Sequence, residues 1–98
     1  MDHIDVAVVG ALGAVGREMI KTLEKSTLPV RRLVPMDVVK NEGKDCVFRN
    51  KRISIVASGG DAFRGVDIAL FSAGADASKE LAPLAVKNRT IIIDNSNQ

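Results

Sequence analysis

The sequence predicts an α/β fold with a doubly wound, mostly parallel sheet and helices on both of its faces. Apolar runs rich in β-branched residues recur along the chain, and amphipathic helical stretches follow the first run and a later one. Strands that alternate with helices are joined by crossovers, which place neighbouring strands in parallel.

The first third of the chain predicts a strand, a helix and a second strand. The apolar run from Ile4 to Val9 suits a strand that is buried on both faces. Apolar residues recur at helical spacing from Val15 to Leu23, so we expect an amphipathic helix of about three turns that ends near residues 26–29. A second apolar run, Val30 to Val34, predicts a strand that ends before Pro35.

The middle of the chain is more polar and predicts a small hairpin. A polar stretch runs from Asp37 to Asp45. The apolar segments Val47-Phe48 and Ile53 to Val56 flank Asn50-Lys-Arg52, a pattern typical of two short strands and a turn.

The last third repeats the order of the first. Asp67 to Phe71 predicts a strand, Ser72-Ala-Gly74 its turn, and the residues from Asp76 or Ser78 to Lys87 a helix. Because a proline removes a backbone donor, we expect Pro83 near the first turn of that helix or at a small kink. A last strand is predicted from Thr90 to Ile93.

Composition excludes several classes of protein. Hydrophobic residues make up 46% of the chain, enough for a core, and a formal net charge of +2 is small for nucleic-acid binding. A single cysteine cannot form an internal disulfide, no apolar run suits a signal peptide or a membrane span, and no metal-ligating cluster is apparent. We therefore predict one cytoplasmic domain over residues 1–98, with no metal and no nucleic-acid or membrane partner.

The glycines between the first strand and the helix carry a functional signal. Gly10-Ala-Leu-Gly13-Ala-Val-Gly16 is a G-x-x-G-x-x-G turn in the strand-to-helix context of a dinucleotide site, which makes the predicted fold Rossmann-type. Gly10 lets the chain leave the strand sharply, Gly13 leaves room for a pyrophosphate, and Gly16 lets the helix pack on the strand. We expect four backbone amides to face the anion, those of Leu12, Gly13, Ala14 and Val15. The alternative is that small residues here only permit tight packing.

Asp37 lies 21 residues after Gly16, the usual distance for a carboxylate that binds the adenosine ribose. Such a carboxylate favours NAD and repels the extra phosphate of NADP. Lys40, Lys44 and Arg49 are close enough in sequence to supply a compensating positive site, so both cofactors remain open. The alternatives are a solvated loop acid for Asp37 and an exposed face for the basic residues.

Three stretches together resemble the aspartate-semialdehyde dehydrogenase family. They are the glycine turn, Asp67-Ile-Ala-Leu-Phe-Ser-Ala-Gly74 followed by Ser78-Lys-Glu80, and Ile92-Ile-Asp-Asn-Ser96. Their order and spacing cover almost the whole chain, and the two later stretches are far more specific in combination than the glycine turn.

The resemblance implies a cytoplasmic, homo-oligomeric, NADP-dependent enzyme. Members of the family reductively dephosphorylate β-aspartyl phosphate to the semialdehyde, on the way to lysine, methionine and threonine. By the same resemblance, Ser72, Ala73 and Gly74 line the cofactor and Asn95 lies near its nicotinamide end. The alternative for Ser72 and Gly74 is a plain strand-to-helix turn, and Ser78 reads as a helix cap.

The chain departs from the family pattern at several positions. Leu12 stands where the family usually has Thr, and Met36-Asp-Val-Val39 stands where it has a Ser-x-Arg-Ser stretch that grips the 2′-phosphate. The residues that usually grip the 2′-phosphate are thus missing. The family leads us to expect NADP, and NAD is the alternative. The family also continues Asp-Asn-Ser with Ser-Ala-Phe-Arg, whereas this chain reads Asn97-Gln98 and ends.

No catalytic residue is predicted within the chain. Semialdehyde dehydrogenation needs a thiolate nucleophile and a general base. We interpret Cys46 as a partly buried small residue and His3 as a surface imidazole, because the family's catalytic Cys and His lie downstream. The chain is thus expected to be a truncated NAD(P)-binding domain, without the catalytic and dimerisation domain and inactive alone. The alternatives are a non-catalytic dinucleotide-sensing or interaction domain, and a related acyl-phosphate reductase of the N-acetylglutamyl phosphate type.

Overall fold

The computed structural model describes residues 3–72 and 75–94, and for residues 75–78 it describes the backbone alone. The elements follow in the order β1 (Ile4–Val9), α1 (Ala14–Lys25), β2 (Val30–Asp37), the 3-10 helix η1 (Val39–Asn41), β3 (Asp45–Phe48), β4 (Lys51–Ser54), β5 (Val56–Ala57), β6 (Ile68–Phe71), α2 (Ala75–Lys87) and β7 (Ile91–Asp94).

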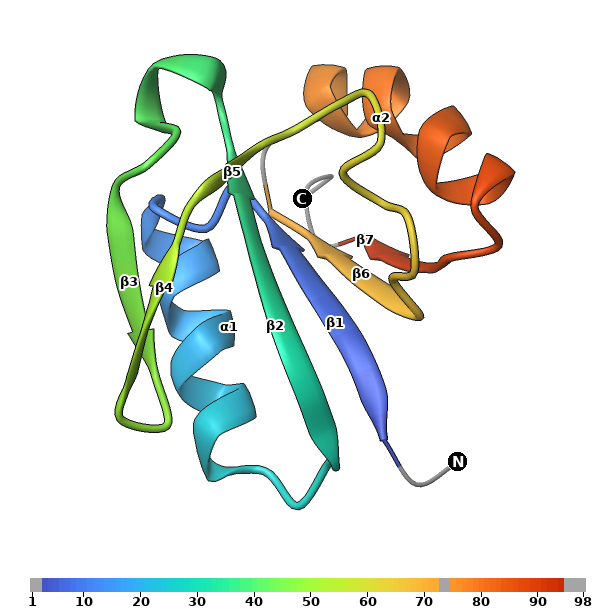
Figure 1. Cartoon of the computed structure of the whole chain (residues 1–98). Helices are drawn as coiled ribbons and strands as arrows, with labels where there is room; N and C mark the ends of the chain where they lie inside the picture. Colours follow the sequence, from blue (N-terminus) through green and yellow to red (C-terminus); the bar gives the residue numbers. More distant parts are fainter. Residues whose placement is uncertain (1–2, 73–74, 95–98) are drawn as a thin grey trace.

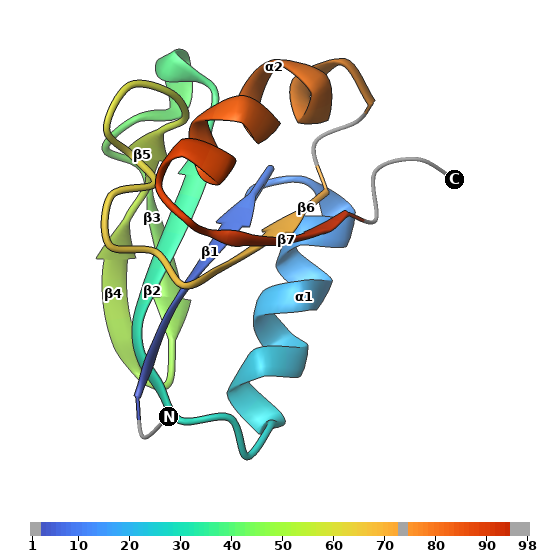
Figure 2. The ribbon, with the colours of Figure 1, turned by 90° about the vertical axis from the view of Figure 1, so that its right-hand side faces the viewer.

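Five parallel strands form one sheet in the order β5-β2-β1-β6-β7, and β3 and β4 form a separate antiparallel hairpin. The helices α1 and α2 lie on opposite faces of the sheet (Figures 1 and 2). The predicted doubly wound α/β fold is therefore confirmed. The strand order reverses at β1, and in such sheets ligands bind beyond the carboxyl ends of the strands at this switch point.

The core has one apolar layer on each face of the sheet. Every residue of β1 is buried, as the apolar run predicted. Ile20 and Leu23 of α1 pack on one face together with Phe48 of the hairpin. On the other face Leu81 of α2 packs with Phe63, and the Phe63 and Phe71 rings stack with centroids 6.0 Å apart.

The strand β2 is longer than predicted, because it continues through Pro35 to Asp37. The carbonyl of Met36 accepts hydrogen bonds from Gly10 and Ala11 on the β1 side. Since backbone groups alternate along a strand, the Pro35 nitrogen faces the β5 side, where pairing begins only at Met36. The missing donor of Pro35 therefore breaks no bond within the sheet, and the prediction that the strand ends at Val34 was wrong.

The predicted hairpin is present, but its second strand was predicted to end two residues too late, at Val56 instead of Ser54. β4 ends at Ser54, and Val56 belongs to β5, which pairs with β2 in the main sheet. The buried Ile55 lies between the two strands. The chain therefore leaves the hairpin after Ser54 and joins the main sheet at Val56, a change that a continuous apolar pattern does not reveal.

Pro83 lies inside α2, well beyond its first turn, contrary to the expectation. A residue at this position would normally donate to the carbonyl of Lys79. Pro83 and Lys79 are both exposed, so water can replace the missing hydrogen bond.

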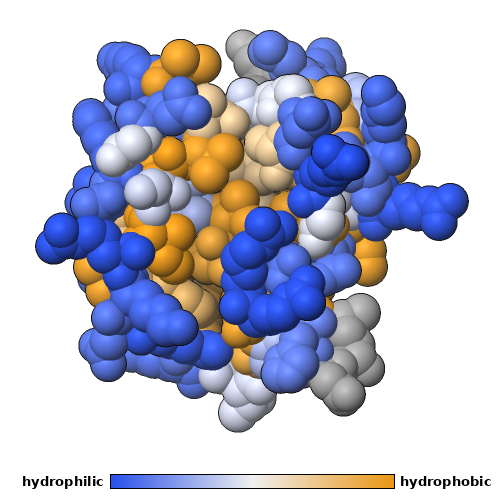
Figure 3. Space-filling view, in the orientation of Figure 1, coloured by the Kyte–Doolittle hydropathy of each residue, from blue (hydrophilic) through white to orange (hydrophobic). Residues whose placement is uncertain are grey.

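In the orientation of Figure 1, the space-filling view has apolar residues near its middle and polar and charged residues around them (Figure 3). The larger exposed apolar side chains include Val38 and Val39, which follow β2. Within the described residues, no helix combines the length and the apolar composition that crossing a membrane requires.

A buried carboxylate joins the amino ends of the central strands. Asp5 accepts hydrogen bonds from Arg31 Nε at 3.0 Å and from Arg31 Nη2 at 2.8 Å, and Arg32 Nη2 lies 3.4 Å from its Oδ2. The Asp5 amide donates to Asp67 Oδ2 at 2.8 Å. The hydrogen bonds from Arg31 lower the pKa of Asp5 more than burial raises it, and the charges of Arg31 and Arg32 lower it further.

We predict that Asp5→Asn destabilises the chain at pH 7 and that the deficit shrinks in acid. The folded Asp5 releases its proton at lower pH than the unfolded chain does, so its contribution is complete at neutral pH and is lost as the pH falls below about 4. Because the exposed Arg31 is screened by solvent, the expected loss in Tm at pH 7 is modest, about 5 °C. Thermal unfolding of both proteins between pH 7 and pH 3 measures this difference, and a constant difference over that range contradicts the prediction.

Candidate functional site

The glycine turn is anchored to the carboxyl end of β2. Gly10 has a φ of 84°, a conformation that a glycine adopts without strain, and it turns the chain out of β1. The amides of Gly10 and Ala11 both donate to the Met36 carbonyl, at 2.9 and 3.0 Å. The turn is therefore held at the edge of the sheet where ligands bind.

Gly16 and Gly13 lack side chains for different reasons. A Cβ atom on Gly16 would overlap the carbonyl oxygen of Gly10 and lie 2.9 Å from the Cα atom of Ala11. A Cβ atom on Gly13 would make only an ordinary contact, 3.5 Å from the Gly10 oxygen, and the φ of Gly13 is −75°. The fold therefore requires glycine at position 16, whereas at position 13 it tolerates a larger residue.

Two of the four amides predicted to face an anion already have partners. The Leu12 amide donates to Asp37 Oδ2 at 3.0 Å, and the Gly13 amide donates to the Gly10 carbonyl at 3.1 Å. The amides of Ala14 and Val15, in the first turn of α1, have no acceptor among the described residues. The exposed start of α1 thus keeps donors available beside Gly13, with the positive end of the helix dipole behind them.

Asp37 fastens the glycine turn to the segment after β2. Besides the Leu12 amide on Oδ2, its Oδ1 atom accepts from the Val38 amide at 2.8 Å and from Asn41 Nδ2 at 3.0 Å. Burial raises the pKa of Asp37, but these hydrogen bonds and the charge of Lys44 lower it by more, so the pKa lies below its usual value. The carboxylate is therefore ionised at neutral pH.

Ser72 connects β6 to the end of β1 at the switch point. Its hydroxyl donates to the Val9 carbonyl at 2.8 Å, and it lies 3.4 Å from the Gly10 carbonyl oxygen. The structure thus brings Ser72 next to the glycine turn, although Ser72 and Val9 are more than sixty residues apart in the sequence. Of the other predicted site residues, Ala73, Gly74 and Asn95 lie outside the described residues. Ser78 lies inside α2, which begins at Ala75, so the expectation that it caps the helix was wrong.

A cleft of about 300 Å³ opens beside the glycine turn at the carboxyl edge of the sheet. Its lining comes from β1, from β2 and the residues after it, from the segment after β5 and from α2: Val9, Gly10, Asp37, Val38, Val39, Ser58, Glu80 and Leu81. Apolar and polar groups are thus combined, which suits a flat heterocycle with a hydroxylated sugar.

Sequence reasoning missed Ser58 and Glu80 as parts of the site. Ser58 follows β5, and its amide and hydroxyl both donate to the Asp37 carbonyl, at 2.9 and 3.2 Å. A separate strand at residues 56–57 would have placed Ser58 at the carboxyl edge, but the apolar pattern joined those residues to the hairpin. Glu80 belongs to the Ser78-Lys-Glu80 stretch of the family resemblance, but no role was assigned to it there.

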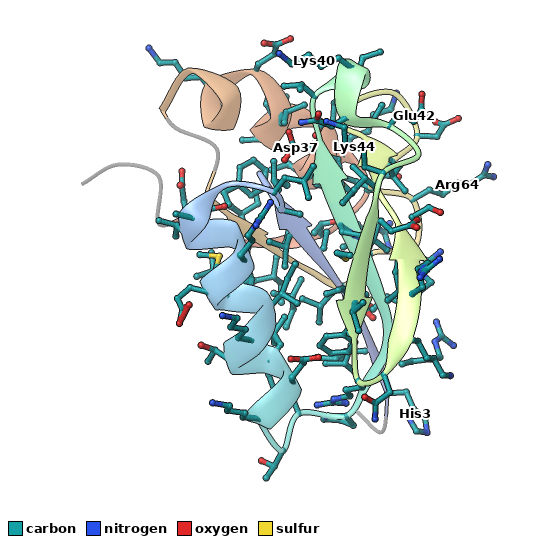
Figure 4. All side chains as sticks on the ribbon, turned by 90° about the vertical axis from the view of Figure 1, so that its left-hand side faces the viewer. His3, Asp37, Lys40, Glu42, Lys44 and Arg64 are labelled. Atoms are coloured by element: carbon teal, nitrogen blue, oxygen red, sulfur yellow. The ribbon has the colours of Figure 1, made fainter. Side chains whose placement is uncertain are left out.

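The basic residues near Asp37 in sequence do not all lie near it in space. Lys40, Glu42 and Lys44 lie around Asp37 at one end of the molecule (Figure 4), and Lys44 Nζ donates to Asn41 Oδ1 at 2.8 Å. Arg49 lies at the other end of α1, where its Nη2 donates to the Leu23 carbonyl at 3.0 Å. Arg49 therefore supplies no charge to this site, and that part of the suggestion was wrong.

Neither Cys46 nor His3 belongs to the cleft. Cys46 is half-buried in β3, as expected, and faces a separate cavity between α1 and the hairpin. Burial raises the pKa of the Cys46 thiol, and Asp45 and Glu24 raise it further, which is the opposite of an activated nucleophile. His3 is exposed at the end of the molecule opposite Asp37 (Figure 4). Within the described residues, no group of His, Cys, Asp and Glu could hold a metal ion.

Residues 5–98 match the family model described as "Semialdehyde dehydrogenase, NAD binding domain". The aspartate-semialdehyde dehydrogenase of Aquifex aeolicus (strain VF5) is 45% identical over 93 residues, which are 94% of this chain and 27% of that protein. The enzyme of the same name from Bacillus subtilis (strain 168) is 42% identical over 94 residues, 96% of this chain and 27% of that protein. This chain thus spans about a quarter of the length of these relatives.

Solved structures show the same arrangement. The crystal structure of aspartate semialdehyde dehydrogenase II from Vibrio cholerae, complexed with ASA, superposes with a TM-score of 0.91 and 35% identity, over 97% of this chain and 31% of that one. The Candida albicans enzyme with NADP has a TM-score of 0.78 and 17% identity over 96% of this chain and 30% of that one, and at that identity the likeness shows the fold alone.

We predict that alanine at the last glycine of the turn destabilises the chain and that alanine at the middle glycine does not. Gly16→Ala forces α1 away from the Gly10 carbonyl, an overpacking that costs about 1–3 kcal/mol of unfolding free energy. Gly13→Ala meets no such overlap and is the matched control. Urea unfolding of both variants measures the two effects, and equal destabilisation would contradict the distinction between the two glycines.

Proposed function

Because this chain belongs to the semialdehyde dehydrogenase NAD-binding domain family, we propose that it binds a nicotinamide dinucleotide across the carboxyl edge of its sheet. The observation that carries the proposal is the glycine turn. Its middle residue, Gly13, lies beside the amides of Ala14 and Val15, which have no acceptor among the described residues, at a position where the fold itself does not require a glycine. A missing side chain next to open donors is what an approaching pyrophosphate needs.

The two halves of the dinucleotide are assigned to the two sides of this turn. The pyrophosphate lies over the start of α1, near the amides of Leu12, Gly13, Ala14 and Val15. The adenosine lies in the cleft, with its ribose at Asp37 and its base against the apolar lining that includes Val38 and Leu81. The nicotinamide half extends past Gly10 towards Ser72, and the family resemblance adds Ala73, Gly74 and Asn95, which lie outside the described residues. The hydroxyl of Ser72, bonded to the Val9 carbonyl, supports this direction.

The cofactor that the family leads us to expect is NADP, and NAD is the alternative. A solved neighbour of the same fold is described as containing NADP. When bound, the reduced dinucleotide would supply the hydride, and the residues of this chain would bind and orient it and neutralise its pyrophosphate.

At the level of the whole enzyme, we propose that this chain provides the nucleotide-binding part of an aspartate-semialdehyde dehydrogenase. The reaction is the reductive dephosphorylation of β-aspartyl phosphate, an acyl phosphate, to L-aspartate 4-semialdehyde in cytoplasmic amino-acid biosynthesis. The enzyme would be a homo-oligomer without nucleic-acid or membrane partners. We assign no catalytic residue to residues 1–98, because the raised pKa of Cys46 and its distance in the fold from the cleft do not suit a nucleophile.

We predict that millimolar NAD or NADP raises the thermal stability of the chain, since a ligand that binds only the folded state must stabilise it. A concentration of 100 times Kd adds about 2.7 kcal/mol to the free energy of unfolding. The Gly13→Ala variant should unfold at the same temperature as the parent chain without ligand and lose most of the ligand-induced shift. Thr27→Ala, in the exposed loop after α1, is the control that should keep the shift.

Thermal unfolding with and without each dinucleotide makes this measurement. A folded chain that shows no shift with either dinucleotide contradicts the proposed site. A shift that Gly13→Ala leaves unchanged would instead place the dinucleotide away from the glycine turn.

A further inference from the structure

Two carboxylates line the cleft to which the proposed function assigns the adenosine. Asp37 reaches it from the end of β2, and Glu80 reaches it from α2 on the other side. Among the described residues that line this cleft, none is a Lys or an Arg. A group placed in the cleft therefore meets negative charge from two elements of the fold.

The Asp37 carboxylate has room for a hydroxyl donor. An ionised carboxylate has about four acceptor positions. Val38 and Asn41 occupy two positions on Oδ1, and the Leu12 amide occupies one on Oδ2. The remaining position on Oδ2 can accept one hydrogen bond, which the 2′-hydroxyl of an adenosine ribose can donate.

A phosphate in place of that hydroxyl fits poorly. A phosphate monoester carries between one and two negative charges at neutral pH, with a second pKa of about 6, and its oxygens are mainly acceptors. It would face the Asp37 carboxylate without a proton to share, and Glu80 would add a second repulsion. The low pKa of Asp37 means that protonation does not relieve this repulsion at neutral pH.

Asp37 cannot simply turn away to admit a phosphate. Its two oxygens hold the Leu12 amide of the glycine turn and the Asn41 side chain of η1, so a rotation breaks bonds that position the pyrophosphate site. Of the nearby cations, Lys44 is bonded to the neutral amide oxygen of Asn41 and keeps its charge, which lowers the pKa of Asp37, but it does not line the cleft. Lys40 on η1 is exposed and does not line the cleft, so it is the residue against which the inference has to be tested.

From these contacts we infer that this chain selects NAD over NADP, and that Asp37 and Glu80 are the residues that determine this specificity. The inference deepens the proposed function and rests on it. It departs from the family expectation of NADP because of side chains that belong to this chain.

The test is the affinity of the folded 98-residue chain for NAD and for NADP, measured by calorimetry at 0.15 M salt, where distant charges are screened. We expect NAD to bind at least about tenfold more tightly than NADP, given the cost of placing like charges together. Asp37→Asn and Glu80→Gln should each lower the ratio of NAD affinity to NADP affinity, mainly by strengthening NADP binding. Glu42→Gln is the matched control, because this exposed carboxylate lies near Asp37 but does not line the cleft.

The variants separate charge from structure. Asp37→Asn keeps an oxygen for the Leu12 amide, and circular dichroism checks its fold. The side chain of Glu80 makes no hydrogen bond to a described residue, so Glu80→Gln carries the test if the Asp37 variant unfolds. An unchanged ratio in a folded Glu80→Gln would remove Glu80 from the inference.

Equal or tighter binding of NADP by the unmodified chain overturns the inference and leaves the proposed function intact. A Lys40→Ala variant that loses NADP binding about tenfold while keeping NAD also overturns it, since Lys40 would then hold the 2′-phosphate. Binding of neither dinucleotide contradicts the proposed function as well as the inference.

Discussion

The close approach of α1 to the glycine turn is the constraint on which the site depends. Gly16 lies so near the Gly10 carbonyl that no side chain fits between them, and this contact fixes where the helix starts relative to β1. Once the helix starts there, its first amides lie beside Gly13 and point out of the edge of the sheet. The Met36 carbonyl then holds the other side of the turn through Gly10 and Ala11. Tight packing and the proposed anion binding are therefore two results of the same geometry.

Two aspartates with hydrogen-bonded carboxylates show how the edges of this sheet differ. At the amino edge, Asp5 is buried and paired bidentately with Arg31, so its charge is neutralised within the protein. At the carboxyl edge, Asp37 is held by two backbone amides and by neutral Asn41, and the charge of Lys44 lowers its pKa, but no arginine among the described residues forms a salt bridge with it. The first arrangement suits stability, and the second leaves a charge directed towards a cleft. Ligands bind at the carboxyl edge of parallel sheets, and the difference follows that rule.

The parts of the fold that depend on local sequence could be predicted, and those that depend on distant partners could not. β1, α1 and the glycine turn carry their own periodicity and glycine pattern, so the sequence indicated them. The continuation of β2 through Pro35 depends on which side of the strand β5 pairs with, and a strand as short as β5 leaves no periodic signal. The prediction therefore left out one side of the cleft, which Ser58 forms through its hydrogen bonds to the Asp37 carbonyl.

Cofactor choice and the stability of the turn are coupled through Asp37. The residues after β2 lie in an exposed segment, where the fold tolerates changes more readily than in the buried strands. In this chain the carboxylate to which we assign the ribose also holds the Leu12 amide, so exchanging it for a residue that admits a phosphate releases a donor in the glycine turn. A change of preference therefore requires a second acceptor for Leu12 as well as a cation for the phosphate. That double requirement explains, in physical terms, why the acidic end of β2 and the glycine turn form one functional unit in this chain.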